Sequence, residues 1–242
     1  MIGQFLVQLS AVLPTRLIHS ISIVDFIAFL NTLAFVLYAY QFAVVAIGVY
    51  VWHSVRSNTL FFLLAYAFGE YLVGTTGFTL AMLRIHNILF HQYASLLYES
   101  MLVLFALTLL REKSNRILLK IIFFSTVIAL LVLVALPLTE VWETLFNYPY
   151  LIEISVGLIV LKDRVNNHEG RTFKEDPWSV ISAILIVTGC ILFFTQLWVT
   201  LEGYFFPYPL LSNILAITIV VTLIIKYILI STQLWNLKRY SM

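Results

Sequence analysis

Long apolar runs separated by short polar segments dominate the chain. The runs predict seven helices, over residues 24–52, 59–82, 90–110, 117–137, 146–161, 178–200 and 209–234. Apolar and polar residues do not alternate along these runs as they do in barrel strands, and a helix of about 20 apolar residues crosses a bilayer. The pattern therefore predicts an all-α polytopic membrane protein with seven transmembrane helices.

The first 20 residues are apolar but are interrupted by Pro14 and Arg16. They have no basic segment ahead of the apolar part, unlike a cleaved signal peptide. We expect residues 1–20 to form an interfacial segment that leads into a seven-helix transmembrane domain over residues 21–242.

Composition agrees with a lipid environment. Hydrophobic residues make up 62% of the chain and charged residues 11%, whereas a soluble domain has about 25% charged residues. The formal net charge of +2 is too small to indicate a nucleic-acid partner. The expected partner is the lipid bilayer, and the expected location is the plasma membrane.

Basic residues predict the orientation of the helices. Apart from Arg16, Arg84 and Lys226, every lysine and arginine falls in one alternating set of segments, at 53–58, 111–120, 162–176 and after 235. Because cytoplasmic loops carry an excess of Lys and Arg, this set is predicted to face the cytoplasm. The N-terminus is then outside and the C-terminus is cytoplasmic, as an odd number of spans requires.

The longest polar segment, residues 162–177, lies on this predicted cytoplasmic side. It is either a solvated loop or a docking surface for membrane-protein partners. The second possibility would make the chain an accessory or structural subunit of a larger membrane complex.

Ionisable residues inside the predicted helices are the main candidates for a functional site. Glu99 and Lys226 each lie twelve residues from the first basic residue at the cytoplasmic end of their helices, about 18 Å along a helix axis. From Glu70 to Arg56 the corresponding distance is about 21 Å, and from Glu153 to Lys162 it is about 13 Å. All four are thus predicted to lie near the middle of the membrane.

Buried charges either pair or become neutral in an apolar medium, and intramembrane ionisable residues are functional-site hypotheses by default. We expect a ligand or ion-pair centre of Lys226 with Glu99 foremost, joined by Glu70 and Glu153. Two alternatives remain: Lys226 extends to the inner membrane surface, and each glutamate is a neutral packing residue. The expected supporting residues are Tyr71, Ser95, Ser100 and Thr222.

The second predicted helix has a small residue at nearly every fourth position, which lets helices approach closely. This stripe consists of Ala65, Gly69, Val73, Gly77 and Ala81. Glu70 is next to the stripe and is therefore expected to face protein. In the fifth helix, Pro149 is read either as the first-turn proline of a helix or as a break beside a binding site at Glu153.

No motif for an enzyme or a metal site is evident. His86 and His91, with Asp25, could be imagined as metal ligands, but the histidines are five residues apart and thus on different helix faces. The chain contains no CxxC, GxSxG or HxxxH sequence. We therefore expect no metal and favour a protein that is not an enzyme.

A chain with seven helices and a lysine in the last one resembles the microbial rhodopsins, in which that lysine binds retinal as a Schiff base. The third predicted helix, HQYASLLYESMLVLFALTLL, is similar to that family's third helix around Tyr93 and Ala94. The resemblance implies retinal as cofactor, Ser95 at the usual position of the acidic counterion, and Glu99 one turn further as its substitute.

The chain also departs from the rhodopsin pattern. Thr222 stands where the family has a second aspartate, Gln92 replaces an arginine, and residues 177–203 lack the Trp…Tyr-Pro…Trp sequence that encloses retinal. The leading prediction from the residues is thus transport or sensing of a proton, ion or small ligand at an intramembrane Glu/Lys centre. A retinal-binding photoreceptor or pump is the alternative.

Overall fold

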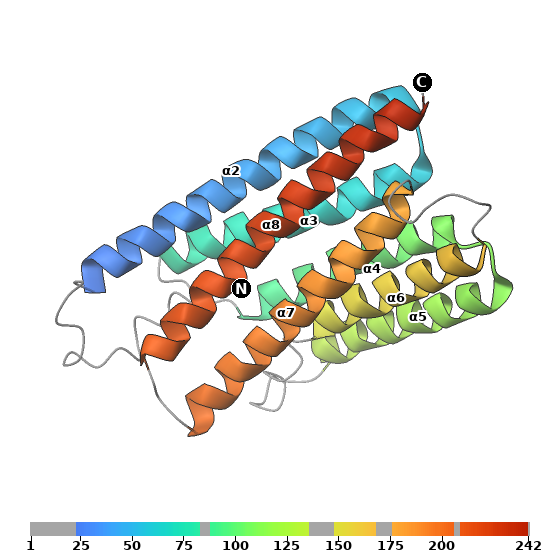
Figure 1. The fold of residues 1–242 in the computed structure, drawn as a ribbon. Coiled ribbons are helices and arrows are strands. Elements are labelled where there is room, and N and C mark those ends of the chain that lie inside the picture. The colour runs from blue at the N-terminus through green and yellow to red at the C-terminus, as the bar shows by residue number, and fades with distance from the viewer. Residues whose placement is uncertain (1–22, 83–87, 136–147, 168–175, 206–208, 242) are drawn as a thin grey trace.

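The computed structural model describes residues 23–82, 88–135, 148–167, 176–205 and 209–241 (Figure 1). The regular structure of this part of the chain is entirely α-helical, as predicted, and its seven helices confirm the expected number. They are α2 (Ile23–Val55), α3 (Asn58–Met82), α4 (Ile88–Leu109), α5 (Lys113–Ala135), α6 (Tyr148–Asn166), α7 (Pro177–Phe205) and α8 (Pro209–Ser241). The predicted interfacial segment, residues 1–20, lies outside the described residues.

Several predicted helix limits were wrong because they followed the apolar runs. Helix α6 continues to Asn166 instead of ending at 161, and α8 continues to Ser241 instead of 234. Polar residues such as Lys162 continue backbone hydrogen bonding as well as apolar ones do, since hydropathy reports burial in lipid and not helix length. The predicted loop 162–177 therefore begins within α6, and its residues 168–175 lie outside the described part.

Six of the helices form a closed ring. Each packs against the next in the order α2, α3, α4, α6, α7 and α8, and α8 returns to pack against α2. Helix α5 lies outside this ring, where it contacts α4 and α6 (Figure 1). Side chains that point inward from α3, α4, α6 and α8 can therefore meet at the centre of the ring.

Glycines bring neighbouring helices of the ring close together. A Cβ atom added at Gly69 of α3 would lie 2.4 Å from the Tyr98 Cβ of α4. One added at Gly157 of α6 would lie 2.8 Å from the Ser182 carbonyl oxygen of α7. Both distances are too short for a side chain, so glycine is required at both crossings. The part of the predicted small-residue stripe at Gly69 is thus a packing contact with α4.

The outer surface of the bundle is apolar, as lipid contact requires. On α5, for example, large apolar side chains are exposed at Ile117, Ile121, Phe124 and Ile128. Four stretches of the described residues are long and apolar enough to cross a membrane: Asn31–Val55, Asn58–Gly77, Pro177–Trp198 and Ile214–Arg239. The chain is therefore an integral membrane protein.

Asp163 links α6 to the connection between α4 and α5 by hydrogen bonds. Its carboxylate accepts hydrogen bonds from the backbone N–H groups of Arg111 and Glu112, both at 3.0 Å, and from the Asn115 amide at 3.1 Å. Burial alone would raise the pKa of Asp163, but these hydrogen bonds outweigh burial and lower it below its ordinary value. The carboxylate thus stabilises the helix ends on which the predicted cytoplasmic basic residues lie.

Asp176 caps the start of α7 at the same end of the bundle. Its carboxylate accepts hydrogen bonds from the Ser179 hydroxyl at 2.6 Å and from the Ser179 backbone N–H at 3.3 Å. Pro177 occupies the first helical position, where its missing N–H costs nothing. An N-cap aspartate followed by proline fixes where α7 begins, one residue before the predicted limit of 178.

We expect Asp163→Asn to destabilise the protein by about 1.5–3 kcal/mol at neutral pH, because hydrogen bonds to a charged acceptor are lost. Since the pKa of Asp163 is lowered in the folded protein, its stabilisation is complete above the ordinary aspartate pKa of about 3.9 and is lost as the pH falls through the lowered value. Thermal unfolding in detergent at several pH values measures the difference in stability between the wild type and Asp163→Asn. This difference should become smaller in acid. Lys113→Gln, which changes an exposed side chain nearby, should show no such dependence on pH.

Candidate functional site

Lys226 lies inside the bundle and does not reach the membrane surface. It is in the middle of α8, with a side chain that is 0% exposed. The alternative in which Lys226 extends to the inner headgroups is therefore wrong. An ammonium in such surroundings requires acceptors within the protein.

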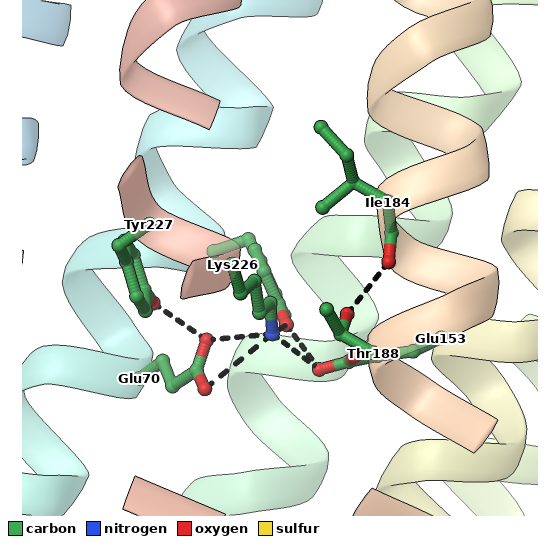
Figure 2. A network of polar contacts seen from close by, with 7 residues as sticks. Glu70, Glu153, Ile184, Thr188, Lys226 and Tyr227 are labelled. Carbon is green, nitrogen blue, oxygen red and sulfur yellow. Dashed lines mark hydrogen bonds and ion pairs between the residues drawn. The ribbon is translucent and has the colours of Figure 1, made fainter. Parts of the chain in front are cut away.

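Two carboxylates from different helices provide these acceptors. The Lys226 Nζ atom lies 2.7 Å from Glu153 Oε1 of α6 and 3.1 Å from Glu70 Oε2 of α3 (Figure 2). It also donates a hydrogen bond of 2.6 Å to the hydroxyl of Tyr66, on α3. The three protons of the ammonium thus have three separate acceptors, and the contacts join α3, α6 and α8 at one point.

Two tyrosines extend the network around the carboxylates. The Tyr66 hydroxyl donates to Glu153 Oε1, and the Tyr227 hydroxyl donates to Glu70 Oε2 at 2.6 Å. The Nζ atom of Lys226 also lies 5.0 Å from the ring centroid of Tyr66, within range of a cation–π interaction. Each paired carboxylate is therefore stabilised by the ammonium and by one phenol.

Glu99 does not contact the lysine, although the sequence placed it first among the partners. It is fully buried on α4, and within the described part of the chain neither of its oxygens has a hydrogen-bond partner. Glu153 Oε2 is also without one there. Glu99 is nevertheless close enough to act electrostatically, together with Glu153 and Glu70, on Lys226. Equal depth correctly placed these residues near one another, but it carried no information on which helix faces meet.

The four expected supporting residues contribute no hydrogen bond to Lys226, Glu70 or Glu153. Thr222 and Ser95 are buried, on α8 and α4 respectively. The Ser100 hydroxyl donates to the backbone carbonyl of Leu97, as a helical serine commonly does. Tyr71 is half-buried. Its ring centroid lies 5.9 Å from that of Phe42, and the two ring planes are tilted by 48°.

Sequence reasoning missed the two tyrosines of the network. Tyr66 precedes Glu70 by one helical turn, so both side chains lie on one face of α3. This spacing was a usable signal for Tyr66. Tyr227 had no such signal, since a residue next to Lys226 on a helix points in a different direction.

Pro149 lies in the first turn of α6, which agrees with its interpretation as a helix-start proline. Its helix begins at Tyr148 and runs without a break past Glu153. Of the residues considered for a metal, His86 lies outside the described part, and the side chains of Asp25 and His91 are likewise not described.

Acidic groups outnumber basic ones at this centre. One ammonium, Lys226, faces the carboxyl groups of Glu70, Glu99 and Glu153. Two like charges 4 Å apart repel by about 4 kcal/mol at an effective dielectric constant of about 20. Burying an unpaired ion costs several kcal/mol more. The arrangement can therefore hold an additional positive charge, such as a proton or a cation.

Fold and site together define an integral membrane helical bundle with buried lysine–glutamate salt bridges. Compared with family models, with curated proteins and with solved structures, the chain matches none. Its function must therefore be argued from the geometry of the centre.

We expect Lys226→Met to destabilise the protein by about 3–5 kcal/mol, because it leaves two carboxylates buried without their cation. Adding Glu153→Gln to this variant should restore part of the loss, since one of the uncompensated charges is then removed. Thermal unfolding in detergent of the single and double variants measures this coupling.

Lys238→Met is the matched control on the same helix. Lys238 contacts the Tyr50 hydroxyl at 2.7 Å near the exposed end of α8, and its replacement should cost less than about 1 kcal/mol. If Lys226→Met and Lys238→Met lowered the free energy of unfolding equally, this would contradict the role assigned to the buried ion pairs of Lys226.

Proposed function

We propose that this protein transports or senses a proton, ion or small ligand through the centre formed by Lys226, Glu70 and Glu153. The observation that carries the proposal is the complete burial of Lys226 between two carboxylates from different helices. Buried ion pairs add little net stability compared with apolar packing, so stability alone is a weak reason to keep one. Ionisable groups inside membrane helices commonly mark a substrate or ion pathway.

The position of the centre supports this role. Its residues come from α3, α6 and α8, which belong to the closed ring of six helices. A charge bound there is screened from lipid by the surrounding helices. A change in the charge at the centre would act on three helices at once, because they share the same ammonium. Such a coupling is what a transporter or a sensor needs.

All seven helices are proposed to span the plasma membrane, with the N-terminus outside and the C-terminus in the cytoplasm. Within the described residues, basic side chains gather where α2, α4, α6 and α8 end and where α5 begins. They are Arg56, Arg111, Lys113, Arg116, Lys120, Lys162, Arg164, Lys238 and Arg239. The positive-inside rule assigns this end to the cytoplasm. The segment 162–177 would be available there to membrane-protein partners.

Reconstituted vesicles test the proposed function. We expect the wild-type protein to carry a measurable proton or ion flux, or to bind a small ligand, and Lys226→Met to reduce this activity at least tenfold. Glu153→Gln should do the same, because it removes the closest charge partner of the lysine. Flux is measured with a pH-sensitive dye inside the vesicles and with ion-selective electrodes outside them.

Lys238→Met serves as the control, since Lys238 lies near the end of α8 and away from the centre. It should retain wild-type activity. Full activity in folded Lys226→Met protein would refute the proposal. A stable complex with other membrane proteins, with no activity of the isolated chain, would instead support the role of accessory subunit.

Retinal binding is the second candidate. It is favoured by one observation, the salt-bridged lysine in the last helix, since a protonated Schiff base at Nζ would need the same carboxylates as counterions. The counterions would then be Glu70 and Glu153, and not Glu99 as the rhodopsin resemblance implies.

Addition of all-trans retinal to the purified protein tests this candidate. A protonated retinal Schiff base absorbs visible light, so a new visible band is expected that is absent in Lys226→Met. Glu153→Gln should shift the band, because a counterion of the Schiff base is removed. An unchanged spectrum after prolonged incubation would exclude retinal as the cofactor.

A further inference from the structure

Glu99 differs from the other two carboxyl groups of the centre in having no ion-pair or hydrogen-bond partner among the described residues. Glu153 accepts hydrogen bonds from Lys226 and Tyr66, and Glu70 accepts them from Lys226 and Tyr227. Both oxygens of Glu99 are buried and receive no hydrogen bond from the described residues. An ionised carboxylate is unfavourable in such a position, whereas a carboxylic acid is neutral and needs no counterion.

We propose that the ligand of this centre is the proton and that Glu99 is the residue that binds it. This inference rests on the function proposed above and narrows it to one ligand. The site is more than a cluster of acidic residues, because Glu99 is completely buried and has no hydrogen-bond partner among the described residues, whereas Glu70 and Glu153 are each ion-paired with Lys226.

The surroundings of Glu99 fit a group that exchanges a proton. The charged groups that act on it are Glu153 of α6, Lys226 of α8 and Glu70 of α3. The phenols of Tyr66, Tyr98 and Tyr150 lie close enough to Glu99 for its charge to act on them. Helix α5, which also packs on α4, has its described charged residues in its first turns, at the basic end of the bundle. Among the described residues, one cation, Lys226, is thus shared by Glu70, Glu99 and Glu153.

A metal ion fits these donors less well than a proton. Calcium takes six to eight oxygen ligands and magnesium about six, whereas a proton needs a single oxygen. Among the described residues no three or more His, Cys, Asp or Glu side chains are arranged to hold a metal ion. The Glu99 oxygens lack even one hydrogen-bond donor there, so a proton on the carboxyl group itself is the simplest way to remove the charge.

Release of this proton to water would create a new negative charge near Lys226. The ammonium is held more closely by Glu153, at 2.7 Å, than by Glu70, at 3.1 Å. The Glu70 side chain is also the more exposed of the two, so it loses less when the ammonium moves away. Deprotonation of Glu99 should therefore draw Lys226 from Glu70 toward α4. Proton binding at Glu99 and the contact between α3 and α8 would thus be coupled.

Infrared spectroscopy of the purified protein tests the proposal directly. The C=O stretch of a protonated carboxylic acid is separate from the bands of a carboxylate, and it shifts to lower frequency in D2O. We expect wild-type protein at neutral pH to show such a band and Glu99→Gln to lose it. Glu112→Gln, which changes a glutamate at the bundle end that contacts Asn115, should leave the band unchanged.

Monodisperse elution and a helical circular dichroism spectrum show whether each variant is folded. If Glu99→Gln is not, Glu99→Asp provides a second test. The shorter acid keeps the proton, so its band should remain at a shifted frequency. A band that is unchanged in either Glu99 variant would overturn the proposal, because another carboxyl group would then carry the proton. Absence of the band from the wild type would overturn it as well.

The spectra also separate this proposal from the proposed function. A band lost in Glu99→Gln, in a protein without any flux or ligand response, would support proton binding at Glu99 and contradict transport or sensing. A flux that depends on Lys226, in a protein without the band, would support transport and overturn the assignment of the proton to Glu99.

Discussion

The ammonium of Lys226 sets the condition that the centre of this bundle must satisfy. An ammonium surrounded by apolar helices is stable only where hydrogen-bond acceptors lie close to it. Its own helix, α8, adds the phenol of Tyr227 to the network, but that hydroxyl donates to Glu70 and does not contact the ammonium. Glu70 and Tyr66 come from α3, and Glu153 comes from α6. These helices are far apart in sequence. The need to satisfy one buried cation therefore links the first, middle and last parts of the described chain.

Close helix packing makes this convergence possible. Gly69 is adjacent to Glu70 and lets α3 approach α4, the helix that carries Glu99. A Cβ atom at Gly189 of α7 would lie 3.4 Å from the Glu153 Cβ, so α7 packs directly against the helix turn that bears this carboxylate. With small residues at these crossings, the acidic side chains are enclosed by protein and not by lipid. The packing thus creates low-dielectric surroundings, in which each charge interacts strongly with its neighbours.

Among the described residues, acidic side chains at helix ends and those at the centre have different surroundings, which separate their roles. Asp163 and Asp176 lie at helix ends, where they accept hydrogen bonds from backbone N–H groups and fix helix positions. The glutamates of the centre have few or no backbone donors available, because helical N–H groups are already bonded within their own helices. They depend on side chains for compensation. At Glu99 the described residues provide no such side chain, and the proton proposed there would neutralise the charge.

The sequence by itself predicted an all-helical membrane protein, whose described residues form seven helices, and it predicted comparable depths for Glu70, Glu99, Glu153 and Lys226. Apolar runs and residue counts along a helix carry this information, because rise per residue is constant. Only the tertiary structure decided that Lys226 pairs with Glu153 and Glu70 and not with Glu99. That choice depends on the order of helices in the ring and on the rotation of each about its axis. Both are set by contacts such as that of Gly69 with Tyr98, which no single run of sequence contains.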